Sequence, residues 1–386
     1  MSTSKGGLEG VVAGTSSICE VDGIGGKLTY RGIGIHELAA YSSFEETAYL
    51  LWYGQLPTRN QLGDLRDRLS CCRDLPLGVL RMIIDFPETA EPMMSLRTAV
   101  SALSMYDPGG TEHHHDVDLS RAILLTSRLP VIVAAHHRAR QKLPPVQPRR
   151  DLSLAANFLY MLTGQIPSEK MSRILDSCLV LHADHELNAS TFAARVAAAT
   201  LSDLYSSVTA AIGTLAGPLH GGANEQVMQM LRRIGDPNRA VEYVAALLEQ
   251  GKKVPGFGHR VYRTEDPRAF ELRKISAVLA EETGETRWYQ MSRRIEEFMI
   301  QEKGINANVD FYSASVYYGL GIPIDVFTPV FAMSRIAGWT AHILEQYGNN
   351  RLIRPRAEYV GAHDVPYLHI DDRVEEDAPA NGVVAA

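Results

Sequence analysis

The chain has 386 residues, of which 45% are hydrophobic and 22% are charged, and its formal net charge is -7 at neutral pH. One compact core rarely holds a chain of this length, so we expect two or more domains. The composition excludes a disordered or fibrous protein, and the negative charge argues against nucleic acid as a partner. The four cysteines are too few and too irregular for a disulfide framework, which predicts a reducing compartment, the cytoplasm.

No targeting or membrane-spanning segment is expected. The first residues, Met-Ser-Thr-Ser-Lys-Gly-Gly, lack the apolar core of a signal peptide. The uncharged run 204–224 has about the length of a spanning helix, but serine, threonine, glycine and proline interrupt it. We predict a buried helix that continues into a loop there, and no membrane partner.

Helix signals cover most of the chain. Three predicted helices have a capping residue at the start and a glycine behind the end: Ser43 with Gly54, Ser153 with Gly164, and Asp266 with Gly284. Further helical runs are predicted near 58–73, 92–106, 168–184, 189–213, 225–234, 238–250, 286–303 and 326–347. Strand patterns are confined to short runs near 18–21 and 28–30 and do not alternate with helices. The predicted fold class is all-α.

Two segments are predicted to lack regular structure. Residues 138–150 contain three prolines among basic residues, which indicates either a surface loop inside a domain or a domain boundary. Residues 370–386 are acidic and contain proline and glycine, which favours a flexible tail.

Three short motifs resemble known sites without meeting their requirements. The segment 256–261 begins like a dinucleotide fingerprint but has valine where the third glycine belongs, and no strand precedes it. The order of histidine and acidic residues in 182–186 fits neither zinc-protease pattern. Three consecutive histidines, 113–115, could attract a metal ion, yet adjacent side chains rarely point at one centre. We therefore expect no metal.

Two histidines lie in glycine-flanked loops. His220 stands within Gly-Pro-Leu-His-Gly-Gly, and His259 follows Pro-Gly-Phe-Gly. Because glycine leaves space beside the backbone, a ligand could approach closely while the imidazole projects into the opening. A helix expected near residue 224 could also lower the pKa of His220 and favour its neutral form. The alternative is that both rings hydrogen-bond to the backbone of a turn.

Three charged residues have unusual surroundings. Arg268 lies at a helix start, where the helix dipole disfavours a cation unless an anion lies nearby or solvent surrounds the side chain. Arg335 is the only formally charged residue in 326–344 and needs a carboxylate, from an internal glutamate or from a substrate. Asp310 precedes a charge-poor run, either as a helix N-cap or as a general base facing an apolar cleft.

Together these segments resemble the citrate synthase family. The resemblance is carried by residues 181–190, 217–225, 255–262, 266–268, 308–310 and 334–335. Residues 7–12, 30–32, 44–46 and 350–356 are similar to the short bacterial form. The match runs from about residue 7 to 361, in order and with compatible spacing, and as a set the motifs are highly specific.

The resemblance implies a nearly all-helical homodimer, with assembly of dimers into larger particles left open. Residues 1–220 and 317–386 would form a large domain, and residues 221–316 a small mobile domain. Closure of the small domain would bury both substrates and exclude water from the reaction.

The resemblance also implies an enzyme that condenses acetyl-CoA with oxaloacetate and hydrolyses citryl-CoA, the entry step of the tricarboxylic acid cycle. Acetyl-CoA would be a co-substrate, and no permanently bound cofactor is implied. Asp310 would remove a methyl proton from acetyl-CoA, His220 would stabilise the enol or enolate, and His259 would protonate the oxaloacetate carbonyl.

Substrate contacts follow from the same resemblance. The carboxylates of oxaloacetate would be held by His185, Arg268, Arg335 and, from the other subunit, Arg354. Coenzyme A would contact Val254, Pro255, Gly256, Phe257, Gly258 and Arg263.

Two alternatives remain. A 2-methylcitrate synthase uses propionyl-CoA on the same scaffold, and the difference of about one methylene is worth only ~1–3 kcal/mol. The segments 311–323 and 351–361 favour citrate synthase. A non-catalytic helical assembly protein is the alternative from another class, but packing alone does not need Asp310 together with both loop histidines.

Overall fold

The structure is a computed structural model that describes residues 6–8, 10–109 and 113–373. Within these residues, helices α1 to α16 dominate, and one small three-stranded antiparallel sheet accompanies them. The all-α prediction is confirmed. The chain divides into two compact units, Met1–Leu352 and Ile353–Ala386, and helices α1 to α16 of the described residues lie in the first. The predicted tail, 370–386, lies outside the described residues from 374 onward.

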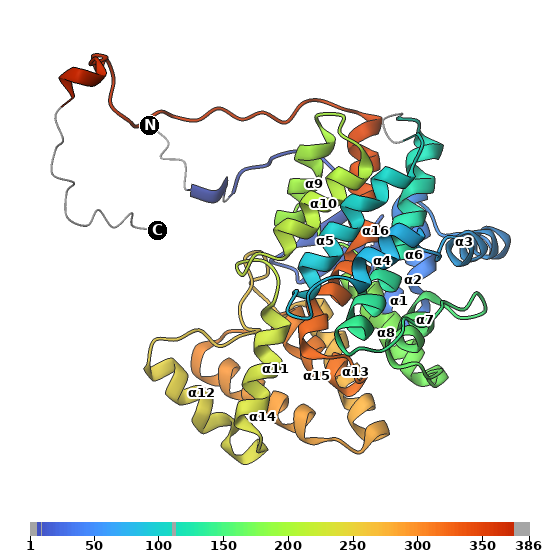
Figure 1. The fold of residues 1–386 in the computed structure, drawn as a ribbon. Helices are drawn as coiled ribbons and strands as arrows, with labels where there is room; N and C mark the ends of the chain where they lie inside the picture. Colours follow the sequence, from blue (N-terminus) through green and yellow to red (C-terminus); the bar gives the residue numbers. More distant parts are fainter. Residues whose placement is uncertain (1–5, 9, 110–112, 374–386) are drawn as a thin grey trace. The chain divides into compact units, whose positions relative to one another are not determined.

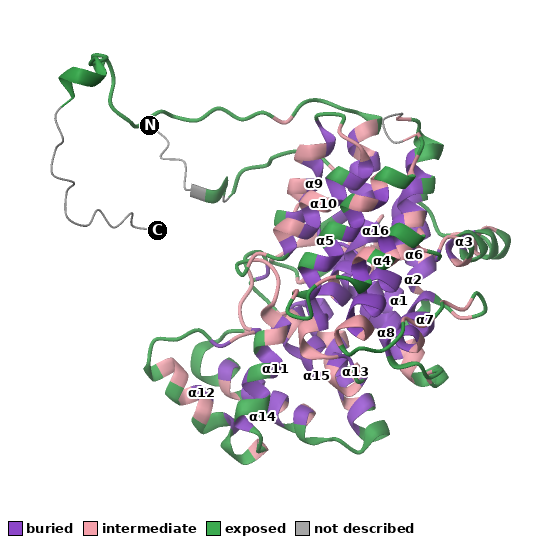
Figure 2. Ribbon diagram, in the orientation of Figure 1, coloured by how far each residue is buried: buried purple, intermediate pink, exposed green. Residues whose placement is uncertain are grey.

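Helix α16 (Phe327–Gly348) forms the centre of the first unit. It packs against α2 (Phe44–Tyr53), α6 (His115–Arg140), α8 (Glu169–His182), α9 (Ala189–Ala198) and α10 (Leu204–Leu215), as Figure 1 shows. Its side chains are buried from Phe327 to Leu344 except at Phe331 (Figure 2). Hydrophobic neighbours on all sides explain why this segment carries almost no charge.

Helix α6 (His115–Arg140) was not predicted from the sequence, although the helix has 26 residues. Most of its side chains are buried, on every face of the helix, so the segment lacks the one-sided apolar period by which helices are recognised. Pro130 lies inside it. Because α6 runs to Arg140 and α7 (Leu154–Thr163) begins soon after, residues 141–153 form a loop within the first unit, as one of the two interpretations of this segment predicted.

The three predicted caps are confirmed. Ser43 begins α2 by accepting a hydrogen bond from the N–H of Glu46, Ser153 begins α7, and Asp266 begins α13 (Pro267–Thr283). Each helix ends at the predicted glycine in a left-handed conformation. Local sequence decides these boundaries because the capping groups lie within three residues of the amides they satisfy.

The prediction of one helix over 189–213 is wrong. The chain forms α9 and α10 instead, separated by Leu201 with φ at 61°. Asp203 starts α10 by accepting from the N–H of Ser206 at 2.9 Å. The uncharged run is, as predicted, a buried helix that continues into a loop. Among the residues that the structure describes, no helix combines the length and apolar character that crossing a membrane requires.

The remaining predicted helices are confirmed with small shifts of their ends. They are α3 (Arg59–Cys71), α5 (Pro92–Leu103), α8, α11 (Ala223–Ile234), α12 (Ala240–Glu249) and α14 (Arg287–Lys303). Two more helices were not predicted: α1 (Ile35–Tyr41) and α4 (Leu77–Ile84). Helix α15 (Val309–Gly319) begins close to the start that the N-cap interpretation of Asp310 implied. Helix α15 packs against α11 and α13, and α14 packs against α12 and α13 (Figure 1). These five helices match residues 221–316 closely, and the two-domain division stays a prediction.

The two predicted strands form a hairpin, β1 (Cys19–Asp22) with β2 (Lys27–Tyr30), and β3 (Ile33–Gly34) extends it. The hydroxyl of Tyr30 donates to the carbonyl oxygen of Asp184 at 3.0 Å. This bond ties the sheet to the segment that carries His185.

Candidate active site

Helix α15 presents Asp310 in its first turn. The N-cap is Asn308, whose side-chain oxygen accepts from the N–H of Asp310 at 3.0 Å. The interpretation of Asp310 as N-cap is therefore wrong. Its carboxylate makes no hydrogen bond to any residue that the structure describes. Burial raises the pKa of Asp310 to about 6, against the lowering effect of Arg268 and Arg335. A half-buried carboxylate with unused acceptors suits a general base.

His220 is held through one ring nitrogen. Its Nε2 accepts from the backbone N–H of Ser190 at 3.2 Å, and the Ser190 hydroxyl lies 2.9 Å from the same atom. Burial first, and the charge of Arg335 second, lower the pKa of His220 to about 4. The ring is therefore neutral near pH 7, as predicted, with its proton on Nδ1. Its surroundings, rather than the following helix, account for the low pKa.

His259 has the opposite tautomer. Its Nδ1 accepts from the backbone N–H groups of Val261 and Tyr262, each at 3.0 Å. Burial, with a contribution from Arg268, lowers the pKa of His259 to about 4. The neutral ring thus carries its proton on Nε2. Both loop histidines bond to backbone, as the alternative interpretation held, and these same bonds fix which nitrogen can donate to a ligand.

His185 stands beside His259. The ring centroids are 5.3 Å apart, and the Nε2 of His185 lies 3.3 Å from the hydroxyl of Tyr262. Burial and the charge of Arg268 lower the pKa of His185 well below its usual range. Tyr262 contacts both histidine rings, which places a buried phenol at the centre of this cluster.

Arg268 is buried and paired. Its Nε and one terminal nitrogen donate to the two carboxylate oxygens of Asp266, at 3.0 and 2.8 Å. Only 2% of Arg268 and 1% of Asp266 is exposed, which excludes the solvent-exposed interpretation. Despite burial, the Asp266 carboxylate raises the pKa of the Arg268 guanidinium. The sequence suggested an anion near Arg268, and Asp266, the N-cap of the same helix, is such an anion.

Arg335 is held by a backbone carbonyl group and an aromatic ring. Its Nε donates to the carbonyl oxygen of His182 at 2.7 Å, and its guanidinium lies over the ring of Phe331. Within the described part of the chain, Arg335 forms no ion pair, which excludes an internal glutamate as its direct partner, one of the two alternatives; the charge of the buried Asp184 still acts on it. The side chain is 2% exposed. A buried cation with free donors is suited to bind a ligand carboxylate.

Electrostatic influence connects these residues. The charge of Arg335 lowers the pKa values of His220, His185 and Asp310. The charge of Arg268 acts on His185, Asp310 and also His259. Such effects fall off with distance, so six predicted residues share one region. The seventh, Arg354, belongs to the second unit and is exposed.

The predicted coenzyme-binding loop runs along the start of α15. The N–H of Asn308 donates to the carbonyl oxygen of Gly256 at 2.9 Å, and its side-chain nitrogen donates to that of Gly258 at 3.0 Å. A Cβ at position 256 would lie 2.8–2.9 Å from atoms of Val227 and Phe311. Glycine is needed at position 256 because of this packing and because φ is 79°. Val254 is buried, Pro255 and Phe257 are half-buried, and the Arg263 side chain is exposed.

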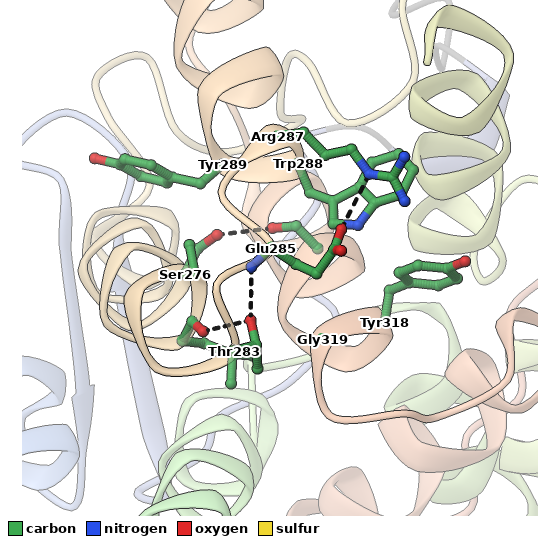
Figure 3. Close-up of a pocket in the computed structure, with 11 residues that line it drawn as sticks. Ser276, Thr283, Glu285, Arg287, Trp288, Tyr289, Tyr318 and Gly319 are labelled. Atoms are coloured by element: carbon green, nitrogen blue, oxygen red, sulfur yellow. Dashed lines mark hydrogen bonds and ion pairs between the residues drawn. The ribbon is translucent and has the colours of Figure 1, made fainter. Parts of the chain in front are cut away.

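Two further features do not join this site. His113 bonds to the carbonyl oxygen of Leu201 at 3.0 Å, and no group of three or more His, Cys, Asp or Glu side chains in the described ranges could hold a metal ion. The pocket in Figure 3 lies between α13, α14 and α15 and is lined by Ser276, Trp288 and Tyr318, among others. It contains none of the predicted site residues.

Two site residues escaped the sequence interpretation. Ser190 contacts a histidine thirty positions away, and no local signal indicates such a contact. Tyr262 lies three positions after His259 in a segment that was already singled out, so its proximity to His259 was predictable. Its contact with His185, 77 positions away, was not.

The all-α fold brings a half-buried carboxylate, two neutral imidazoles and two buried arginines into one region, an arrangement typical of an enzyme active site. Residues 7–356 match the family described as citrate synthase, C-terminal domain. A citrate synthase of Haloferax volcanii is 50% identical over 374 residues, covering 96% of this chain and 99% of the relative. A 2-methylcitrate synthase 1 of Corynebacterium glutamicum is 40% identical over 372 residues, covering 95% and 98%.

A solved structure gives the same result. The ternary complex of carboxymethyl coenzyme A and oxaloacetate with citrate synthase from Thermoplasma acidophilum superposes with a TM-score of 0.90 at 34% identity, covering 95% of this chain and 98% of that one. The chain belongs to the citrate synthase family.

Proposed function

We propose that this protein is a citrate synthase, which condenses acetyl-CoA with oxaloacetate and hydrolyses citryl-CoA to citrate and CoA. The observation that carries the proposal is the combination of a carboxylate of raised pKa with two histidines held neutral in opposite tautomers. Enolisation of a thioester needs a base and a neutral donor, and the following condensation needs a second donor.

Asp310 is the base in this proposal. With a pKa of about 6 it is mostly ionised at pH 7, yet it is more basic than an ordinary carboxylate. It takes a proton from the methyl group of acetyl-CoA while Nδ1–H of His220 donates to the thioester oxygen. A neutral donor suits this role because it stabilises the developing enolate without a charge that would have to be buried beforehand.

His259 acts on the second substrate. Its Nε2–H points away from the backbone bonds at Nδ1 and is available to the oxaloacetate carbonyl, which gains a proton as the carbon–carbon bond forms. Arg335, Arg268 and His185 hold the carboxylates of oxaloacetate. The free donors of Arg335 support this assignment, since a buried guanidinium is stabilised by a bound carboxylate.

Coenzyme A contacts the 254–258 loop, with Arg263 near a phosphate. The exposed side chain of Arg263 supports this assignment.

We further propose that the protein is a homodimer in which Arg354 reaches the partner's site. Residues 221–316 move as a small domain in this proposal, and no permanent cofactor is needed. The four cysteines are all free, which supports a cytoplasmic location.

The first test measures oxaloacetate-dependent release of free thiol from acetyl-CoA and, separately, from propionyl-CoA. We expect release that is faster with acetyl-CoA. A preference for propionyl-CoA would move the function to 2-methylcitrate synthase while keeping the fold and the base. No release from the folded protein with either substrate would exclude both and favour a non-catalytic scaffold.

Asp310→Ala separates chemistry from folding. Because the carboxylate has no partner among the described residues, the variant should fold normally and lose about three or more orders of magnitude in turnover. Near-normal turnover would remove Asp310 from the mechanism.

A further inference from the structure

The hairpin turn between β1 and β2, residues 22–26, lies against the segment 261–265. The backbone N–H of Arg263 donates to the carbonyl oxygen of Gly23 at 2.8 Å. The turn is itself well defined. Asp22 pairs with Lys27, and its Oδ1 accepts from the N–H groups of Ile24 and Gly25 at 3.0 and 2.8 Å. A fixed turn therefore presents its backbone to the segment that follows His259.

The approach at Gly23 is too close for any side chain. A Cβ at position 23 would lie 2.2 Å from the carbonyl oxygen of Val261 and 2.8 Å from its carbonyl carbon. Both are backbone atoms, so no rotamer change relieves the overlap. Gly23 is not in the left-handed region, so alanine would be acceptable there but for this contact. A substitution must move either the turn or the segment.

Movement of the segment would reach the candidate catalytic groups. Val261 and Tyr262 supply the two N–H groups that hold Nδ1 of His259, and the Tyr262 hydroxyl lies beside His185. Displacing the Val261 backbone would turn the His259 ring and redirect its Nε2–H. Reactions of this kind depend on donor placement to within about 1 Å.

We propose that the 22–26 turn positions His259 and Tyr262 for the reaction, with Gly23 as the contact residue. Gly23 is a positioning residue, because it touches neither substrate nor reacting atoms. This role rests on the proposed function. The contact also joins residues assigned to the predicted large domain with residues assigned to the predicted small one.

Gly23→Ala tests the proposal, with Ile24→Ala as the matched control in the same turn. The Ile24 side chain is 83% exposed, so its removal should leave the turn in place. We expect kcat/KM to fall about tenfold to a hundredfold in Gly23→Ala, mainly through kcat, and to change less than about twofold in Ile24→Ala. Hydrogen exchange of the Arg263 amide should become faster in Gly23→Ala only, because that amide loses its acceptor.

A Gly23→Ala enzyme with wild-type kcat would overturn the proposal, as would equal losses in both variants.

If Gly23→Ala does not fold, Asp22→Ala replaces it, with Asp22→Asn as the conservative rescue. Loosening the turn should then lower kcat several-fold and speed exchange at Arg263 in Asp22→Ala alone, and an Asp22→Ala enzyme without these changes would overturn the role. A wild-type protein that releases no thiol would refute the proposed function; an active wild type with an unaffected Gly23→Ala would refute only the positioning role.

Discussion

The Nε2 atom of His220 accepts a hydrogen bond from the backbone N–H of Ser190 at 3.2 Å. A backbone amide can only donate, so this bond excludes a proton on Nε2 of the neutral ring. Ser190 is itself fixed, because the indole N–H of Trp339 in the central helix donates to its hydroxyl at 3.1 Å. The core of the protein thus sets the tautomer of a candidate catalytic histidine.

The tautomer predicts how two substitutions of His220 differ. The side-chain nitrogen of asparagine can stand near the place of Nδ1, whereas that of glutamine stands near the place of Nε2. We expect His220→Asn to retain more turnover than His220→Gln, which should lose about a hundredfold or more because no donor faces the thioester. Steady-state kcat at saturating substrates measures the difference. The reverse order would mean that Nε2 is the donor.

The raised pKa of Asp310 predicts that kcat/KM falls on the acid side of the pH profile. Its raised pKa of about 6 means that the carboxylate is protonated, and inactive as a base, as the pH falls below that value. His220 and His259, with pKa values of about 4, stay neutral over this range. The logarithm of kcat/KM should therefore decline below about pH 6 with a slope near one. A profile that stays flat down to pH 5 would contradict the assignment.

The buried pair of Asp266 and Arg268 predicts a loss of stability. Asp266→Asn keeps an oxygen to cap α13 but removes the charge that compensates Arg268, and should cost about 3–5 kcal/mol in the free energy of unfolding, measured by urea denaturation. The double variant with Arg268→Gln should be less destabilised than Asp266→Asn alone. Equal stability of Asp266→Asn and wild type would show that the pair is not needed for folding.

The sign of the pH effect on this pair follows from the lowered pKa of Asp266. Burial opposes the lowering of this pKa, but the charge of Arg268 and its hydrogen bonds to the carboxylate together outweigh it. The stabilisation is therefore present above the pKa of the unfolded chain and is lost as the pH falls through the lower folded value. The difference between wild type and Asp266→Asn should shrink in strong acid.

The proposed role of Arg354 in the partner's site predicts that two inactive variants can restore activity to each other in a mixed dimer. If it completes the partner's site, Arg354→Ala and Asp310→Ala should each be nearly inactive alone. A mixed dimer contains one site with both defects and one intact site. Random reassociation should then restore about a quarter of wild-type turnover. No recovery, from dimers shown to have exchanged subunits, would place Arg354 in its own subunit's site or outside the reaction.

Local features of the fold follow from the sequence alone. The caps at Ser43, Ser153 and Asp266 and the glycines behind them set helix ends correctly, because the groups involved lie within one turn of each other. Motif order identified the family and six residues that share one region. Helix α6 escaped detection, since a helix buried on every face has no period to read.

Contacts between distant parts of the chain set which nitrogen of each histidine carries the proton and which groups surround the arginines. Ser190 and His220 are thirty positions apart, and Arg335 bonds to the carbonyl oxygen of His182 from 153 positions away. The hydrogen bond from the N–H of Arg263 to the carbonyl oxygen of Gly23 likewise joins two segments that lie far apart in the sequence. Packing of distant elements creates these contacts, and it also creates the burial that raises or lowers each pKa.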